Sequence, residues 1–167
     1  AVCCMHAIKE AILAREHDPK VKSFIFYTDI RASGKGFQDY VLRAEQGYGV
    51  TFIRGRVGRI GLDSNENLFI HYENTLARKV EIMPVDLAIL ATCLVPRKDA
   101  SLVANILGIQ TDENKFFQSH PFSPTESVVP GIFLCGCCEG AKDIPESVTQ
   151  ASAAAMKAAE FLKQRQF

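Results

Sequence analysis

The sequence has no tryptophan, no net charge and no apolar run long enough to cross a membrane. Its 19 basic and 19 acidic side chains balance, and neither sign gathers into a block. Without a basic stretch, the chain offers no electrostatic site for nucleic acid or for an anionic membrane surface. The longest apolar stretch, 85–95, contains Asp86 and falls well short of the roughly 20 residues that a membrane span needs. We therefore expect no nucleic-acid partner and no membrane span.

Two familiar sequence signals are also missing. The first residues, 1–4, contain no initiator methionine, no charged segment and no long apolar core, so they do not form a signal peptide. We expect the chain to begin inside a longer protein. No G-x-G-x-x-G motif follows a predicted strand, because Gly55, Gly58 and Gly61 have a different spacing and no helix after them. The loop that holds a dinucleotide pyrophosphate is therefore not expected in this chain.

The chain does contain enough apolar material for a core. Of its 167 residues 47% are hydrophobic, which fits one ordinary domain or two small ones. Six cysteines occur, most of them in tight clusters: Cys3, Cys4, Cys93, Cys135, Cys137 and Cys138. Clusters without a secretory signal are typical of a reducing compartment and of metal or redox chemistry, so we expect a cytoplasmic protein. Cys93 and Cys135 fit a second interpretation, as small buried apolar residues.

The apolar pattern of the first half predicts alternating helices and strands. Apolar residues recur with the helical period over 4–17, and Asp18-Pro19 ends that helix. A strand over 22–30, a helix over 37–45 and a strand over 50–54 form one unit, which implies a parallel strand pair with a right-handed crossover. Short antiparallel strands follow over 56–60, 67–73 and 79–83. This alternation indicates the α/β class.

The second half is predicted to hold a buried strand over 85–91, a helix over 102–107 and short strands over 116–118 and 132–135. A loop over 136–142 leads to a helix that continues to about residue 163. Asp143 and Glu146 have the spacing of a capping box, and Pro145 suits the first turn of a helix. One face of this helix carries mainly small side chains, so its axis can approach a sheet or a cofactor closely.

Three segments of the sequence resemble one flavoprotein family. They are 2–11, which reads VCCMHAIKEA; 26–37, which contains FYTDIR and GKGF; and 131–155, which contains GCCEGAKDIPESVTQASAAA. Together they are similar to the A-type subunit of heterodisulfide reductase, within the thioredoxin-reductase-like FAD flavoproteins, over nearly the whole chain. The resemblance implies an α/β, Rossmann-like FAD/NAD(P)-binding fold that lacks its first FAD-binding half.

The resemblance also implies a domain organisation and a function. In that family, a pyridine-nucleotide-like domain is inserted between two halves of a flavin domain. Residues 1–98 correspond to the inserted domain without its first strand, and 99–167 to the C-terminal half of the FAD domain. The parent protein is expected to be an oxidoreductase subunit that passes electrons between FAD and [4Fe-4S] clusters, in complex with other subunits.

The fragment by itself is expected to be inactive and to bind neither FAD nor an iron–sulfur cluster. It is also expected to self-associate, because the missing strand leaves backbone edges exposed beside the strands that begin at Lys22 and Val50.

Two groups of site residues are implied at the start of the chain. The resemblance makes Cys3 and Cys4 ligands of a [4Fe-4S] cluster whose other cysteines lie upstream; four thiolates are the usual complement. A position at a helix start favours their thiolate forms. Lys9 follows Cys4 by about one and a half helical turns. The resemblance places Lys9 at the electron-exchanging edge of the flavin, where a cation stabilises the reduced form. From the sequence pattern alone, Lys9 is a solvated surface lysine.

The flavin-binding residues implied by the resemblance lie near the end of the chain. Relatives carry Gly-Asp where this sequence has Gly136-Cys137, so we expect the backbone of Gly136, Cys137 and Cys138 to contact the flavin. The start of the next helix is expected to point at the flavin pyrimidine, where negative charge collects on reduction. Its contributing residues are Ile144, Pro145, Glu146 and Ser147.

Two alternative functions stay open. Cys137 and Cys138 could act directly in a thiol–disulfide oxidoreductase, although adjacent cysteines form strained and easily reduced disulfides and no separate resolving pair is evident. The chain could also be a degenerate nucleotide-binding fold that serves only to dock partner subunits. The replacement of Gly-Asp, and of the glycine in the family's A-T-G-x-x-P turn by Cys93, favours that second alternative.

Overall fold

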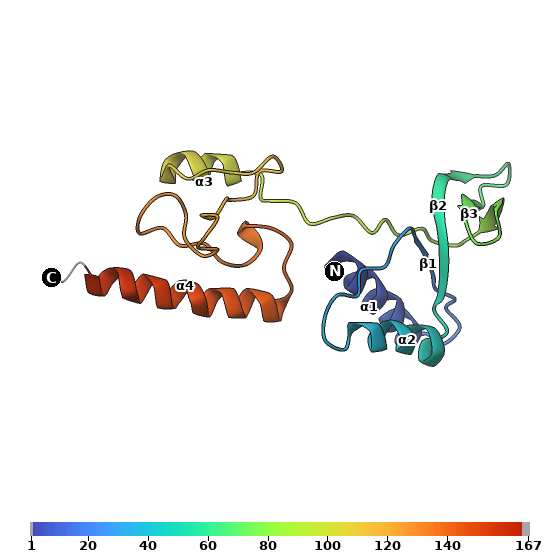
Figure 1. Ribbon diagram of the computed structural model, residues 1–167. Coiled ribbons are helices and arrows are strands. Elements are labelled where there is room, and N and C mark those ends of the chain that lie inside the picture. The colour runs from blue at the N-terminus through green and yellow to red at the C-terminus, as the bar shows by residue number, and fades with distance from the viewer. Residues whose placement is uncertain (1, 165–167) are drawn as a thin grey trace. The chain divides into compact units, whose positions relative to one another are not determined.

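The computed structural model describes residues 2–164 of the chain. The chain divides into two compact units, Ala1–Thr92 and Cys93–Phe167. Figure 1 shows the elements of both units, coloured in chain order. Each unit has its own buried cluster of apolar side chains, so each is described by itself. The assignment of 1–98 and 99–167 to an inserted domain and half of a flavin domain stays a prediction.

The first unit is a four-stranded sheet with two helices. Its strands follow one another in the order β1-β2-β3-β4. β1 pairs with β2 in parallel, whereas β2 with β3 and β3 with β4 are antiparallel. The predicted strand–helix–strand unit is thus confirmed as β1, α2 and β2. The elements are α1 (Val2–His17), β1 (Phe24–Tyr27), α2 (Phe37–Tyr48), β2 (Thr51–Leu62), β3 (Leu68–Asn74) and β4 (Lys79–Pro84).

β2 is one long strand where the sequence predicted two short ones. Its first residues pair with β1, from Phe24↔Thr51 onward, and its later residues pair with β3, from Gly55↔Asn74 onward. A side chain at Gly55 would collide with the main-chain carbonyl of Glu73, so glycine permits this close approach. A register shift between Val57 and Arg59 leaves one extra residue on β2. The glycines therefore shape a continuous strand rather than end it.

The core of the first unit joins the two helices to the sheet. Ile8 and Ile12 of α1 are 1% and 3% exposed, and they cluster with Ala44 of α2 and with Val50. The spacing of Ile8 and Ile12 by four residues puts both side chains on one face of the helix. Because Ala44 is small and fully buried, α1 and α2 can approach closely. The predicted buried face of the first helix is confirmed.

The second unit has little regular sheet. It contains α3 (Ala100–Leu107), the single turn η1 (Gly136–Cys138) and α4 (Ile144–Gln164). The predicted strands over 116–118 and 132–135 are wrong: each takes part only in an isolated bridge, Thr111↔Phe117 and Glu126↔Phe133. Its buried cluster consists of Ala104, Ile109 and Leu134. No helix within residues 2–164 combines the length and the apolar character that a membrane span requires.

The predicted buried strand over 85–91 is wrong. The segment forms no strand, and Leu87, Ile89 and Leu90 are 72%, 80% and 70% exposed. A strand needs a neighbour to satisfy its backbone groups. Within the described part of the chain, the segment pairs with β3 only at Val85, whose N–H donates to Leu68 O over 3.0 Å. An apolar run indicates burial but does not say which neighbour provides it.

A polar network ties β3 to β4. The Glu81 carboxylate accepts hydrogen bonds from the Tyr72 hydroxyl at 2.6 Å and the Asn74 amide at 3.2 Å, and Lys79 Nζ lies 2.6 Å from Glu81 Oε1. The contact with Lys79, followed by those with Tyr72 and Asn74, lowers the pKa of Glu81 from 4.5 to about 2. The bond to Glu81 raises the pKa of Tyr72 from 10 to about 12. Both shifts favour the charge states found at neutral pH.

We expect this network to lose its stabilising effect between about pH 4.5 and 2. The folded pKa of Glu81 is the lower one, so the unfolded chain takes up a proton first as the pH falls through this range. Glu81→Gln should therefore destabilise the chain at pH 7, with a cost that shrinks toward pH 2. Urea unfolding at several pH values measures the difference, with Glu73→Gln on the exposed side of β3 as control. A cost that stays constant from pH 7 to 2 would contradict the prediction.

Candidate functional site

The turn formed by Gly136, Cys137 and Cys138 lies against the start of α4. Cys135 has extended backbone, and Gly136 then adopts the left-handed region with φ of 72°. This conformation favours glycine, because a side chain there is strained. An added Cβ on Gly136 would lie 3.9 Å from Cβ and Oγ of Ser147. The structure therefore brings together the two predicted flavin-contacting segments, 136–138 and 144–147.

The predicted capping box at the start of α4 is confirmed. The Glu146 N–H donates to Asp143 Oδ1 at 2.8 Å, and the Asp143 N–H donates to Glu146 Oε2 at 2.9 Å. Pro145 has no N–H, so Ile144 carries the one remaining donor of the first helical turn. Two carboxylates lie beside this helix end and compensate its partial positive charge. The helix start thus offers a flavin one backbone donor rather than a strong positive field.

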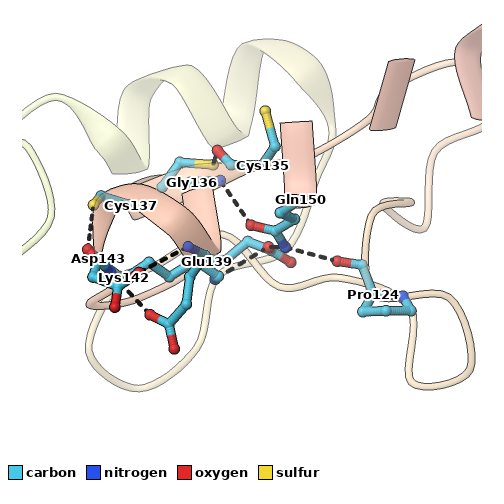
Figure 2. A network of polar contacts seen from close by, with 10 residues as sticks. Pro124, Cys135, Gly136, Cys137, Glu139, Lys142, Asp143 and Gln150 are labelled. Carbon is cyan, nitrogen blue, oxygen red and sulfur yellow. Dashed lines mark hydrogen bonds and ion pairs between the residues drawn. The ribbon is translucent and has the colours of Figure 1, made fainter. Parts of the chain in front are cut away.

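A glutamine two turns into α4 connects three segments of the second unit, as Figure 2 shows. Gln150 Oε1 accepts a hydrogen bond from the Gly136 N–H at 2.7 Å. Gln150 Nε2 donates to Pro124 O at 3.1 Å and to the Glu139 carboxylate. The Glu139 carboxylate also pairs with Lys142 Nζ at 3.4 Å. Sequence reasoning missed Gln150, because its position within the run 136–155 does not reveal contacts with residues before the helix.

The cysteine side chains of the turn face two different backbone carbonyls. Cys137 Sγ lies 3.6 Å from Lys142 O, whereas Cys138 Sγ donates to Cys135 O at 3.1 Å. Burial raises the pKa of the Cys138 thiol. Nucleophilic cysteines have a lowered thiol pKa instead. The geometry of the turn therefore suits backbone contact better than thiol chemistry.

The remaining predicted site residues lie together on α1, in the first unit. Cys3 and Cys4 are half-buried in its first turn, and Lys9 is exposed. Lys9 takes part in none of the ion pairs found among the described residues. Within residues 2–164, no three or more histidine, cysteine or carboxylate side chains gather where they could hold a metal ion. The roles of Cys3, Cys4 and Lys9 stay predictions.

Solved structures of the same fold match the chain. The thioredoxin reductase of Lactococcus lactis matches 94% of this chain with a TM-score of 0.64 and 20% identity, and the chain covers 50% of that structure. This confirms the predicted α/β, Rossmann-like fold of the thioredoxin reductases. No protein-family model matches the chain.

Two of the curated relatives are more specific, and both are A-type subunits of heterodisulfide reductases. The chain is 43% identical over 164 residues to the second A-type iron–sulfur subunit of the CoB–CoM heterodisulfide reductase of Methanopyrus kandleri, covering 96% of this chain. It is 42% identical over 169 residues to the A-type subunit of the H2/formate:CoB-CoM heterodisulfide,ferredoxin reductase of Methanococcus maripaludis, covering 99% of this chain. The chain spans 25% and 26% of the lengths of these relatives. The resemblance to the A-type subunit of heterodisulfide reductase is thus confirmed for that part of the protein.

Removal of the cap at Asp143 is expected to destabilise the second unit. Asp143→Ala leaves the Glu146 N–H without its acceptor, at a cost of about 0.5–2 kcal/mol in the free energy of unfolding. Asp143→Asn keeps an oxygen at the same place and should cost less. Urea unfolding of both variants measures the difference. Equal losses for the two substitutions would show that the hydrogen bond contributes nothing.

Proposed function

We propose that this chain belongs to a flavin- and iron–sulfur-dependent oxidoreductase subunit that passes electrons between FAD and [4Fe-4S] clusters. The identity of 43% to an iron–sulfur subunit of heterodisulfide reductase, over 96% of the chain, is the observation that carries this proposal. The proposed partners are the other subunits of such a complex, since the relatives are themselves named as subunits. The active protein is the whole subunit within its complex, rather than this segment.

The turn at Gly136 is suited to contact a flavin ring through its main-chain atoms. Gly136 has no side chain to obstruct a planar ring, and Cys137 lies exposed beside it. When bound, FAD accepts and releases electrons one or two at a time. The proposed task of Gly136, Cys137 and Cys138 is to bind and orient the ring through main-chain groups. Ile144, Pro145, Glu146 and Ser147 complete this contact with the first turn of α4.

The first turn of α1 suits a role in supplying part of the ligand set of an iron–sulfur cluster. Cys3 and Cys4 supply two thiols, half of the four that such clusters usually require. Both cysteines are half-buried, which limits the access of water to a bound cluster. The proposed role of the chain here is to provide two ligands of a cluster that is completed by cysteines elsewhere in the whole protein.

α1 provides a rigid connection between the proposed cluster and the proposed flavin edge. Ile8 and Ile12 anchor the helix in the core of the first unit, so Cys4 and Lys9 keep a fixed separation. We assign Lys9 to the electron-exchanging edge of the flavin, where its charge stabilises the reduced form. Its exposed position leaves the ammonium group accessible for such a contact.

A docking role is the second candidate function, and the exposed apolar segment before Pro96 favours it. Leu87, Ile89, Leu90 and Val95 are each at least 70% exposed. Exposed apolar patches of this kind mark interaction surfaces. In contrast, the direct thiol–disulfide alternative is disfavoured by the thiols of Cys137 and Cys138, which face different carbonyls. Docking and electron transfer are compatible within one member of a complex.

Replacement of Lys9 is expected to lower the flavin reduction potential in the full-length protein. Loss of one charged contact corresponds to about 30–65 mV for a two-electron couple. The FAD content should stay near normal in Lys9→Ala, because the turn at Gly136 holds the ring. Spectroelectrochemical titration measures the potential, with Lys9→Arg as the charge-preserving control. An unchanged potential and turnover in Lys9→Ala would make Lys9 an ordinary surface lysine.

Replacement of Cys3 or Cys4 by serine is expected to lower the iron content of the full-length protein without lowering its FAD content. Serine removes the soft sulfur ligand that iron–sulfur clusters require. Cys93→Ser is the matched control, because Cys93 is exposed and lies outside both predicted sites. Iron and flavin are quantified in the same preparation. Full iron occupancy in Cys3→Ser and Cys4→Ser would remove α1 from the proposed cluster site.

A further inference from the structure

The backbone before α4 needs an external support to keep its shape. The segment from Pro124 to Asp143 contains one short helical turn, η1, and an isolated bridge between Glu126 and Phe133. Segments with so few regular hydrogen bonds open locally at low free-energy cost. The left-handed Gly136 adds a point at which the chain can change direction. The shape of the turn therefore depends on contacts with other segments. One is the backbone hydrogen bond from the Phe117 N–H to Cys138 O at 2.8 Å, and the others come from α4, which is regular.

Gln150 provides that support through both ends of its amide group. The carbonyl oxygen accepts from the Gly136 N–H at 2.7 Å, while the NH₂ group donates to Pro124 O at 3.1 Å and to Glu139. A carboxylate of the same length would accept from Gly136 but could not donate to Pro124 or Glu139. An apolar side chain would satisfy none of the three groups. Among side chains of this length, only glutamine carries both the acceptor for Gly136 and the donors for Pro124 and Glu139.

Glu139 makes this arrangement more sensitive to substitution. Its side chain is only 7% exposed, and its carboxylate is paired with Lys142 Nζ at 3.4 Å as well as with Gln150. A buried carboxylate is costly unless hydrogen-bond donors surround it. Lys142 supplies one of these donors from the loop and Gln150 supplies the other from α4. The contact with Gln150 therefore holds the residues on both sides of Cys137 and Cys138.

We propose that Gln150 is a positioning residue that holds the Gly136–Cys138 turn in the form in which it contacts the flavin. Its hydrogen bond to Gly136 fixes the backbone one residue before Cys137, and its contact with Glu139 fixes the residue after Cys138. Gln150 itself does not need to touch the ring. The part of this proposal that concerns the flavin rests on the proposed function.

The test measures the accessibility of Cys138 in the full-length protein. Cys138 is half-buried and its thiol donates to Cys135 O at 3.1 Å, so opening of the turn is expected to speed its labelling by iodoacetamide. Labelling is followed by peptide mass spectrometry, in flavin-depleted and in FAD-loaded protein, with the exposed Cys93 as internal reference. The variants are Gln150→Met, which removes all three contacts, and Gln150→Glu, which keeps the acceptor for Gly136. Gln164→Met, an exposed glutamine of the same helix, is the matched control.

We expect Cys138 of flavin-depleted Gln150→Met to be labelled about tenfold faster than in the wild type, relative to Cys93. Gln150→Glu should show a smaller increase, and Gln164→Met none. If Gln150→Met does not fold, Gln150→Glu alone decides the question. Unchanged labelling of Cys138 in the folded variants would overturn the positioning role. Faster labelling with undiminished FAD content would support the positioning role and count against the flavin contact of the turn.

Discussion

The hydrogen bond from the Gly136 N–H to Gln150 Oε1, 2.7 Å long, is the contact on which the candidate site depends most. The second unit contains isolated bridges rather than a regular sheet. Hydrogen bonds from side-chain amides and to carboxylates therefore hold its segments together. Through this contact the regular helix α4 imposes a shape on the irregular turn before it. The capping box at Asp143 and Glu146 then keeps the start of the same helix in place. Turn and helix start therefore form one structural unit.

In the first unit, an apolar core rather than a polar network holds the candidate site residues in place. Two isoleucines one turn apart on α1 bury themselves against Ala44 and Val50, and this apolar contact fixes the helix on the sheet. Polar and charged residues of α1 are left on its outer faces, where Lys9 is exposed and Cys3 and Cys4 are half-buried. For the proposed electron-transfer function, the hydrophobic core of this unit keeps the cluster ligands and the cation at a constant separation.

Local features of the sequence were good predictors where the interacting residues are neighbours in the chain. The capping box needs only the spacing of Asp143 and Glu146. The first helix, predicted over 4–17 and found as Val2–His17, needs only the repeat of its apolar residues. Predictions failed where a distant partner decides the outcome. The apolar run over 85–91 has the composition of a buried strand, yet it remains exposed and unpaired beyond Val85 in the described chain.

The sequence by itself determined the α/β class, the start of α4 and the resemblance to the A-type subunit of heterodisulfide reductase, because each of these depends on residue types at short, fixed spacings. Only the tertiary structure decided that Gln150 reaches Pro124 and Glu139, and that the thiols of Cys137 and Cys138 face different carbonyls. These contacts depend on how an irregular loop folds back onto a helix. No periodicity of the sequence encodes that path, since hydrogen bonds between remote residues form wherever the backbone brings a donor and an acceptor together.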